Sequence, residues 1–332
     1  MKAARLHAYT DDPGSAFTIE DVEAPEVQSP HDVIVEVSGA GWCHTDNHIV
    51  EGAFEPIADH ELPYTPGHEN AGVVAEVGDE VTLVSPGDTV VVHPPMTCGT
   101  CRACRKGKDM YCPEHQFVGV DVDGGFAEQL RTVDRSVIPL DSLDPVEAAP
   151  HADAGITAYN AVKKASKKIE PGDFAVLVGI GGLGHIGLQA LHAISPAQTI
   201  AVDVKDSALD LAEKYGVDHA INAAEEDVPS VVGDVTDGRM ALKVLDFVGN
   251  ESTLGLGPEV LCPGGDHHVV GYEGQLDVPA MALVGGEMDY RGTLVGTYTE
   301  LQELVDLAER GLVEVEYSTY PLDDINEIAQ RL

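Results

Sequence analysis

The sequence is poor in positive charge and in aromatic side chains. It has 19 Lys and Arg against 57 Asp and Glu among 332 residues, which gives a formal net charge of −38. A surface of that charge repels phosphate-rich polymers and anionic bilayers, so we expect no nucleic-acid and no membrane partner. The chain also lacks a long apolar run, and its first residues, MKAARLHAY, lack the apolar core of a signal peptide. These absences predict a cytoplasmic protein.

The acidic residues are spread along the chain instead of forming one disordered tail. Short acidic groups occur, for example, at 11–12, 225–227 and 323–324. A compact fold with this much like charge repels itself unless salt screens the charges, and the Debye length falls to about 3 Å near 1 M salt. We therefore interpret the composition as adaptation to a halophilic host with molar salt in its cytoplasm. An ordinary acidic protein is the alternative.

The pattern of hydrophobic residues changes near residue 155. Up to about residue 150, short β-branched runs such as VIVEV (33–37) alternate with Gly, Pro and Asp, which predicts an irregular, mostly β region. From about 155 to 294, strand-like segments such as FAVLVG (174–179) alternate with helix-like ones such as SALDLAEKY (207–215). This alternation predicts an α/β domain with a parallel sheet covered by helices.

A chain of 332 residues exceeds the length that one hydrophobic core normally serves, so we expect two domains. Their predicted bounds are 1–153 and 154–294. The remaining segment, 295–332, is expected to return to the first domain. It contains a helix-like stretch at 300–310 and a strand-like run, VEVEY, at 313–317.

The segment GIGGLG (179–184) lies between a predicted strand and a predicted helix, which is typical of a dinucleotide-binding loop. Asp203 ends the next strand, where a carboxylate can accept hydrogen bonds from ribose hydroxyls and repels a 2′-phosphate. This favours NAD over NADP, although Lys205 could soften the discrimination, and a solvated strand end is the alternative for Asp203. The predicted cofactor-binding residues here are Gly179, Gly181, Gly182, Leu183, Gly184, Asp203 and Lys205.

Four of the six cysteines lie within fifteen residues, in the pattern C-x2-C-x2-C-x7-C. Four thiolates at this spacing can close tetrahedrally around one zinc ion with no open position, so the site would be structural. An iron–sulfur cluster and a zinc ribbon that contacts nucleic acid are the alternatives, and the net charge opposes the second. The predicted ligands of this loop, 98–112, are Cys98, Cys101, Cys104 and Cys112.

A second metal site is suggested by GWCHTDNH (41–48) and PGHENAG (66–72). A catalytic zinc needs three protein ligands and one open position. Judged from the residues alone, Cys43 and His68 form a weak pair, because a single buried cysteine is usually a packing residue.

The order of several motifs strengthens this second site. CHTDNH, GHENAGVVAEVG, the four-cysteine loop, DGGFAEQ, DAGITAY and GIGGLGHIGLQ follow one another along the chain. In this order the sequence resembles zinc-containing medium-chain alcohol dehydrogenases over essentially its whole length. The resemblance implies a GroES-like catalytic domain at 1–153 and a doubly wound Rossmann domain at 154–294.

The resemblance also implies roles for residues near the second site. Cys43 and His68 would bind the catalytic zinc, Asp46 would orient His68, and Glu69 would approach the metal transiently. Many family members have a cysteine as third ligand where this chain has Asp153, and microbial secondary-alcohol dehydrogenases with a DAG motif are similar to it. Zinc accepts a carboxylate in place of a thiolate. A helix N-cap is the alternative role for Asp153.

For the reaction, the resemblance implies that zinc lowers the pKa of a bound alcohol, which then gives a hydride to NAD. Thr45 would bridge the alcohol to the nicotinamide ribose, and His48 would pass the proton to solvent. His44 lies where relatives often have a residue that meets the cofactor pyrophosphate.

The resulting prediction is a reversible alcohol dehydrogenase for primary and secondary alcohols, with two zinc ions per chain and NAD, or else NADP. Its partners would be a small alcohol or ketone and further copies of itself, in a homotetramer or a homodimer. A polyol or glucose dehydrogenase on the same scaffold is one alternative. A non-enzymatic, zinc-stabilised binding protein is another, because a fold does not guarantee a function.

Overall fold

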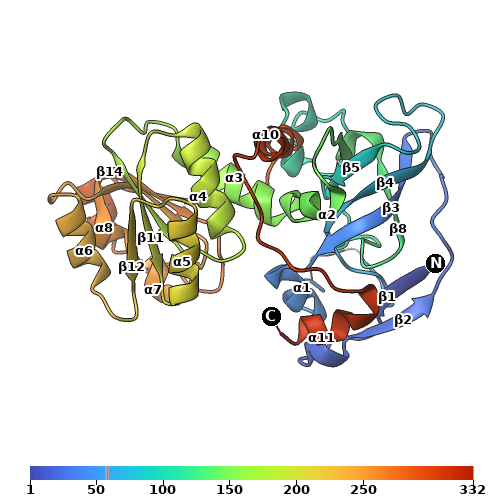
Figure 1. The fold of residues 1–332 in the computed structure, drawn as a ribbon, viewed down its shortest axis with the longest axis horizontal. Coiled ribbons are helices and arrows are strands. Elements are labelled where there is room, and N and C mark those ends of the chain that lie inside the picture. The colour runs from blue at the N-terminus through green and yellow to red at the C-terminus, as the bar shows by residue number, and fades with distance from the viewer. Residues whose placement is uncertain (57, 59, 332) are drawn as a thin grey trace. The chain divides into compact units, whose positions relative to one another are not determined.

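The computed structural model describes residues 1–56, 58 and 60–331, which form two compact units. Unit 1 comprises Met1–Ala154, Thr297–Glu309 and Glu316–Leu332, and unit 2 comprises Gly155–Gly296 and Arg310–Val315. Figure 1 shows both units, with the chain coloured from blue at the N-terminus to red at the C-terminus. No helix among the described residues is long and apolar enough to cross a lipid bilayer.

Unit 1 is built around a five-stranded antiparallel sheet in the order β8-β3-β4-β5-β9. Two small antiparallel pairs, β1 with β2 and β6 with β7, complete its strands. The mostly β region expected from the sequence is therefore confirmed. The strands are β1 (Lys2–Leu6), β2 (Phe17–Asp21), β3 (Asp32–Gly41), β4 (Glu69–Val77), β5 (Thr89–Val92), β6 (Pro95–Met96), β7 (Gln116–Phe117), β8 (Gln129–Val133) and β9 (Val137–Pro139).

Valines of β3, β4 and β5, such as Val35, Val74 and Val90, form a buried cluster, because β-branched side chains pack well on a pleated sheet.

The helices of unit 1 are short, apart from α10. The α-helices are α1 (His44–Val50), α2 (Pro145–Ala148), α10 (Tyr298–Glu309) and α11 (Ile325–Ala329). The 3₁₀ helices are η1 (Pro13–Ser15), η2 (Cys104–Lys106), η3 (Asp109–Tyr111), η4 (Asp134–Ser136), η5 (Ala149–Ala152) and η6 (Leu322–Asp324).

Unit 2 contains a six-stranded parallel sheet in the order β12-β11-β10-β13-β14-β15. Numbered within the unit, this is the order 3-2-1-4-5-6 of the doubly wound dinucleotide-binding fold. Its strands are β10 (Phe174–Val178), β11 (Gln198–Asp203), β12 (His219–Asn222), β13 (Ala241–Asp246), β14 (Leu261–Val269) and β15 (Asp289–Gly292). The predicted α/β class is therefore confirmed.

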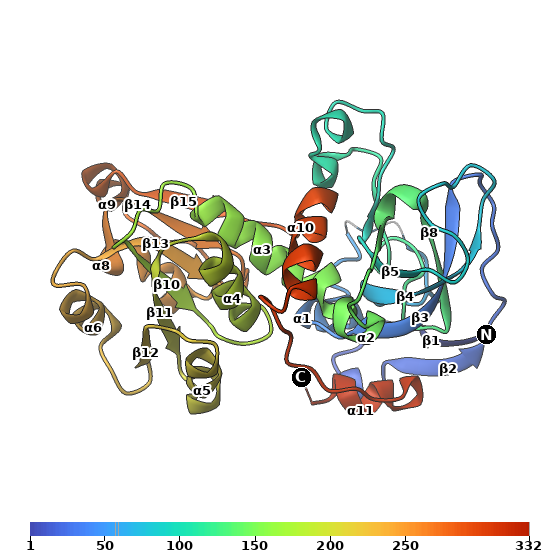
Figure 2. The same cartoon turned by 45° about the horizontal axis from the view of Figure 1, so that its top comes forward.

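Helices cover both faces of this sheet. Figures 1 and 2 show α4 and α5 on one side of the strands and α6 and α8 on the other. The helices are α3 (Ala154–Ala165), α4 (Gly184–Ile194), α5 (Asp206–Lys214), α6 (Val228–Val235), α7 (Glu251–Leu254), α8 (Gly257–Val260) and α9 (Ala280–Gly286). The central strand β10 is buried along its whole length, which explains its continuous apolar run.

The C-terminal segment differs from the expectation in two places. The segment Arg310–Val315 belongs to unit 2, although all of 295–332 was expected to join the first domain. The run VEVEY at 313–317 is not a strand. The main chain here has a partner distant in sequence, because the side-chain amide of Gln189 donates to the carbonyl of Glu314 at 2.9 Å and accepts its N–H at 2.9 Å. One α4 side chain thus binds both main-chain groups of Glu314, where a neighbouring strand would otherwise be needed.

Candidate metal and dinucleotide sites

Cys43 is held at the N-terminus of α1 by a reciprocal pair of hydrogen bonds. The Thr45 N–H lies 3.3 Å from the Cys43 sulfur, and the Cys43 N–H donates to Oδ2 of Asp46 at 2.9 Å. This is the geometry of a capping box, with a thiol in place of the usual hydroxyl. The local sequence Cys-x-x-Asp therefore fixes both the sulfur and the carboxylate at the start of the helix.

Three donor atoms from distant parts of unit 1 converge around one point. Nε2 of His68 lies 3.1 Å from the Cys43 sulfur and 3.4 Å from Oδ2 of Asp153, and that oxygen lies 3.8 Å from the sulfur. Ligands of one tetrahedral zinc ion are separated by about 3.3–3.6 Å, given usual Zn–N, Zn–O and Zn–S lengths. The three side chains therefore fit a single zinc ion without moving far.

The charge balance around these donors also fits a cation. Burial raises the pKa of the Cys43 thiol to about 12, and burial together with Asp153 raises the pKa of Glu69 to about 8. Burial works against a protonated His68, yet Asp46, Cys43 and Asp153 raise its pKa well above the ordinary value. The cluster therefore binds protons where a divalent cation would otherwise compensate its negative charge.

Asp46 and Glu69 lie behind the three donors. Asp46 is fully buried, and its Oδ1 is 3.3 Å from Nδ1 of His68, on the side of the ring away from Cys43 and Asp153. Oε1 of Glu69 accepts the N–H of Ala154 at 2.8 Å, next to Asp153. A carboxylate on the second ring nitrogen of a ligating histidine fixes its tautomer and raises its basicity.

Gly41 is a residue of this site that sequence reasoning missed. It pairs with Glu69 across β3 and β4, and a Cβ at this position would overlap Oε2 of Glu69 and lie 2.9 Å from its Cβ. The site therefore requires a glycine here to leave room for the carboxylate. The signal in the sequence is its place two residues before Cys43, but strand pairing with Glu69 was needed to interpret it.

The predicted proton-path residues lie on α1. Thr45 is half-buried in the first turn, and Nδ1 of His48 lies 3.5 Å from Oε2 of Glu51. His44 is exposed, and its ring meets that of His48 edge to face, with centroids 5.0 Å apart. The structure thus places all three on one helix, which begins directly after Cys43.

The four cysteines of the loop 98–112 come together as predicted. Their sulfurs all lie within 4.8 Å of one another, with 3.6 Å between Cys98 and Cys112 and 3.5 Å between Cys101 and Cys104. Four thiolates around zinc are separated by about 3.8 Å. Main-chain N–H groups of Thr100 and Cys101 lower the pKa of Cys98 to about 6, so this thiolate forms easily.

The glycine-rich segment of unit 2 has the shape of a dinucleotide loop. Gly179 has φ +85°, and a Cβ on Gly184 would overlap the Gly179 carbonyl, so both positions need glycine. A Cβ on Gly181 or Gly182 would meet nothing within 4 Å, which leaves this side open to a ligand. Leu183 precedes α4 without a side-chain cap, as suits a helix start that receives a phosphate.

Asp203 ends β11 beside this loop. Its Oδ2 accepts the N–H of Ile180 at 2.8 Å, and its Oδ1 accepts the N–H of Lys205 at 3.0 Å. The carboxylate is therefore oriented by main-chain groups and retains lone pairs for ribose hydroxyls. The predicted residues of unit 2 thus lie together, whereas His44 belongs to unit 1.

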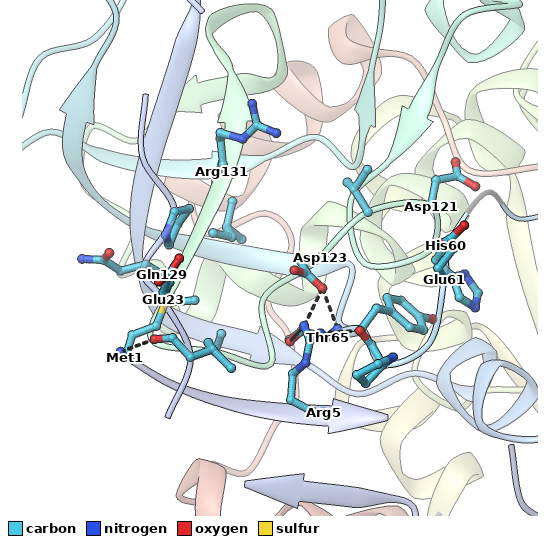
Figure 3. A pocket seen from close by; sticks show the side chains of 18 of the residues that line it. Met1, Arg5, Glu23, His60, Glu61, Thr65, Asp121, Asp123, Gln129 and Arg131 are labelled. Carbon is cyan, nitrogen blue, oxygen red and sulfur yellow. Dashed lines mark hydrogen bonds and ion pairs between the residues drawn. The ribbon is translucent and has the colours of Figure 1, made fainter. Parts of the chain in front are cut away.

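Unit 1 also contains a cavity of 560 Å³, shown in Figure 3. Arg5 lines this cavity and donates to Oδ1 of Asp123 at 2.9 Å and to the hydroxyl of Thr65 at 3.2 Å. None of the residues predicted from the sequence as metal or cofactor ligands is among its lining residues. The ion pair links β1 to the loop before β8. Because the cavity shares no lining residue with the predicted ligands, we regard it as separate from the metal site.

The sequence is similar to known proteins over its whole length. Residues 29–142 match the family model described as alcohol dehydrogenase GroES-like domain, and residues 182–310 match the model described as zinc-binding dehydrogenase. An NAD-dependent alcohol dehydrogenase of Sulfurisphaera tokodaii is 36% identical, with 100% of this chain and 96% of the relative covered.

Solved structures show the same likeness. An alcohol dehydrogenase from Aeropyrum pernix is 46% identical, covers 100% of this chain and 96% of its own, and superposes with a TM-score of 0.93. A D-arabinose dehydrogenase from Sulfolobus solfataricus is 31% identical, covers 97% of both chains, and superposes with a TM-score of 0.86. The fold is therefore shared with these enzymes over essentially the whole chain.

Proposed function

The chain belongs to the zinc-type medium-chain alcohol dehydrogenase family, and from this we propose that it oxidises primary and secondary alcohols to aldehydes and ketones with NAD. The observation that carries the proposal is the convergence of Cys43, His68 and Asp153 on one tetrahedral position. Three ligands with one position left open are characteristic of a catalytic zinc site.

In this proposal Cys43, His68 and Asp153 hold the catalytic zinc. When bound, zinc supplies a Lewis acid that lowers the pKa of the alcohol, and NAD supplies the hydride acceptor. Asp46 keeps Nδ1 of His68 protonated, so that Nε2 faces Cys43 and Asp153 as a lone pair. Glu69 holds the N–H of Ala154 and thereby the chain next to Asp153.

The proton of the alcohol has to reach solvent. Thr45 carries the hydroxyl of α1 that lies beside Cys43, since its own N–H contacts the Cys43 sulfur at 3.3 Å. His48 lies one helical turn further on, with a quarter of its side chain exposed and Glu51 beside it. A histidine titrates in the range needed to hand a proton to water near neutral pH.

The remaining predicted ligands complete the assignment. Cys98, Cys101, Cys104 and Cys112 hold a second, structural zinc, because their sulfurs leave no open position. The glycine loop 179–184 receives the cofactor pyrophosphate and Asp203 the adenosine ribose. The acidic Asp203 favours NAD, and Lys205 beside it leaves NADP as the alternative. His44 is proposed as a further pyrophosphate ligand.

A sugar dehydrogenase is the second candidate, because the structurally similar Sulfolobus enzyme is named D-arabinose dehydrogenase. Steady-state kinetics with 2-propanol, 1-propanol, D-arabinose, glucose and sorbitol distinguish the two. A higher kcat/KM for the simple alcohols supports the first proposal, and a higher value for a sugar or sorbitol supports the second. The non-enzymatic alternative predicts loss of the catalytic ligands, whereas Cys43, His68 and Asp153 lie together and the four cysteines form their own group.

The setting of the enzyme belongs to the same proposal. We propose that it works in a cytoplasm of molar salt, because the net charge of −38 needs screening. We also propose a homo-oligomer, either a tetramer or a dimer. Sedimentation in 3 M and in 0.1 M KCl measures its assembly under both conditions.

The central experiment is zinc content together with turnover, both measured in high-potassium buffer. The wild type should hold two zinc ions per chain and reduce NAD with 2-propanol. Asp153→Asn should lose one zinc ion and turnover, whereas Asp153→Cys, which restores the thiolate that many relatives have, should keep both. Asp141→Asn, which removes an exposed carboxylate of unit 1, is the control and should behave as wild type. One zinc ion per wild-type chain and no turnover would exclude the proposal.

A further inference from the structure

Asp109 contacts both the four-cysteine loop and the segment that returns from unit 2. It lies in η3, between Cys104 and Cys112, and its main-chain carbonyl accepts the N–H of Cys112 at 2.8 Å. Its side chain leaves the loop, and Oδ2 accepts the N–H of Tyr298 at 2.9 Å. One residue therefore touches a predicted zinc ligand with its main chain and α10 with its carboxylate.

The carboxylate of Asp109 is placed at the first turn of α10. Tyr298 is the first residue of that helix, so its N–H is one of the donors that have no partner within the helix. A carboxylate at a helix N-terminus also interacts favourably with the helix dipole. Nδ1 of the buried His93 lies 3.7 Å from Oδ2 of Asp109. The hydroxyl of Tyr298 donates to the carbonyl of Val137 at 3.0 Å. The start of α10 is thus anchored in unit 1.

Helix α10 in turn supports the chain that carries Asp153. It contacts η5, whose last residue, Ala152, directly precedes Asp153. Leu301, Leu304 and Val305 of α10 are buried, so the helix is a packed part of unit 1. The next residue after Asp153, Ala154, donates to Glu69 at 2.8 Å. A contiguous set of contacts therefore leads from Cys112 through Asp109, α10 and η5 to Asp153.

Main-chain hydrogen bonds shape the turns of this loop, for example from the N–H of Lys108 to the carbonyl of Ala103 at 3.0 Å, but the loop contributes little to the buried core. Among residues 98–112, Cys112 alone belongs to the buried hydrophobic core. A segment without its own core depends on its metal ion for its conformation. A metal ion on the four cysteines would therefore fix η3, and with it the Asp109 carboxylate that faces α10.

We propose that Asp109 is a positioning residue that couples metal binding in the four-cysteine loop to metal binding at Cys43, His68 and Asp153. The inference rests on the proposed function, because it presupposes that both ligand sets bind metal. Loss of the loop metal frees the N-terminus of α10, loosens its packing on η5, and lets Asp153 leave the position in which it completes the second site.

The first test is cobalt(II) binding to the full-length protein, with zinc kept in the cysteine loop and the second site emptied by mild chelation. The absorption band of thiolate-ligated cobalt reports binding beside Cys43 without any need for turnover. Asp109→Ala should raise the dissociation constant by between about twofold and thirtyfold, the range measured for couplings across a protein. Asp109→Asn keeps a carbonyl oxygen for the Tyr298 N–H and should recover most of the affinity.

The matched control is Glu114→Ala, which removes an exposed carboxylate just beyond Cys112 and should leave the cobalt affinity unchanged. A second route removes the same hydrogen bond from the other side. Tyr298→Pro lacks the N–H at a helix position that tolerates proline, and Tyr298→Ala lacks only the side chain. Weaker cobalt binding in the proline variant than in the alanine variant supports the proposal, and equal binding opposes it.

A double-mutant cycle with Cys98→Ser isolates the coupling. Loss of the loop metal should weaken cobalt binding in the wild-type background and have a much smaller effect in the Asp109→Ala background. Additive effects would overturn the coupling. A wild type that binds no cobalt beside Cys43 would instead refute the proposed function, so the two failures are distinguishable. Circular dichroism identifies a variant that has not folded, in which case the Tyr298 pair decides.

Discussion

Asp46→Asn tests whether a carboxylate behind His68 sets the metal affinity of the catalytic site. Asp46 is fully buried; its Oδ2 accepts the N–H of Cys43 at 2.9 Å, and its Oδ1 lies 3.3 Å from Nδ1 of His68. An asparagine has the same shape but only one acceptor oxygen. One of the two donors must therefore face its NH₂ group, whichever way the amide is turned.

The cost follows from the histidine tautomer. If the amide oxygen stays on the Cys43 N–H, the NH₂ group meets Nδ1 of His68, which has to give up its proton and shift it to Nε2. The nitrogen that faces Cys43 and Asp153 is then protonated and cannot bind a metal ion. Replacing such a partner of a ligating histidine typically lowers metal affinity by about 10–100-fold, or about 1.4–2.7 kcal/mol. We expect a loss in that range.

The assay is competition for zinc with a chromophoric chelator, at constant high salt. Asp46→Asn should release one zinc ion at about 10–100-fold lower chelator concentration than wild type, whereas the zinc ion of the four-cysteine loop should be released as before. Asp88→Asn, at an exposed carboxylate that accepts the Ser85 N–H at 2.8 Å, is the control for loss of charge. A zinc affinity within twofold of wild type would refute the role that we assign to Asp46.

Three further outcomes are expected. Gly41→Ala should lower the free energy of unfolding by about 1–3 kcal/mol and weaken the catalytic metal, because the new methyl group overlaps Glu69; urea unfolding and zinc content measure both, and unchanged values would contradict the packing. Burial lowers the pKa of His268 to about 4, so between about pH 4 and pH 6.5 the unfolded chain binds a proton that the folded chain does not. Stability should therefore fall by about 2 kcal/mol between pH 7 and pH 5 from this residue, and His268→Leu should show a correspondingly flatter pH dependence of urea unfolding. Dialysis from 3 M to 0.1 M KCl should lower the melting temperature, because the charges behind the net −38 lose their screening; full stability without salt would refute the halophilic interpretation.

Much of the fold could be predicted because its patterns are local. The runs of residues that become β10 and β11 are largely apolar and alternate with helix-forming segments, so their parallel arrangement follows from the alternation. The prediction was wrong for VEVEY at 313–317, where alternation indicated a strand. A strand needs a partner edge, and here the Gln189 side chain binds the main chain of Glu314 instead. Hydrophobic pattern contains no information about such a partner.

The candidate sites divide in the same way. The positions of the four cysteines and of the glycine loop could be predicted from the sequence alone, since the predicted ligand-binding residues of each lie within fifteen residues of one another. Cys43 and Asp46 also fix one another locally, through the cap of α1. Short segments with these spacings have few ways to arrange their donors, which is why spacing was informative.

Only the tertiary structure brings Cys43, His68 and Asp153 together, because they lie 25 and 110 residues apart along the chain from the cysteine. The resemblance to a family suggested the three ligands, but the pairing of β3 with β4 and the contact of η5 with β4 place them around one point. The need for glycine at Gly41 and the contact of Asp109 with Tyr298 arise in the same way. Each depends on which segments become neighbours, and that is decided by how the whole chain buries its apolar surface.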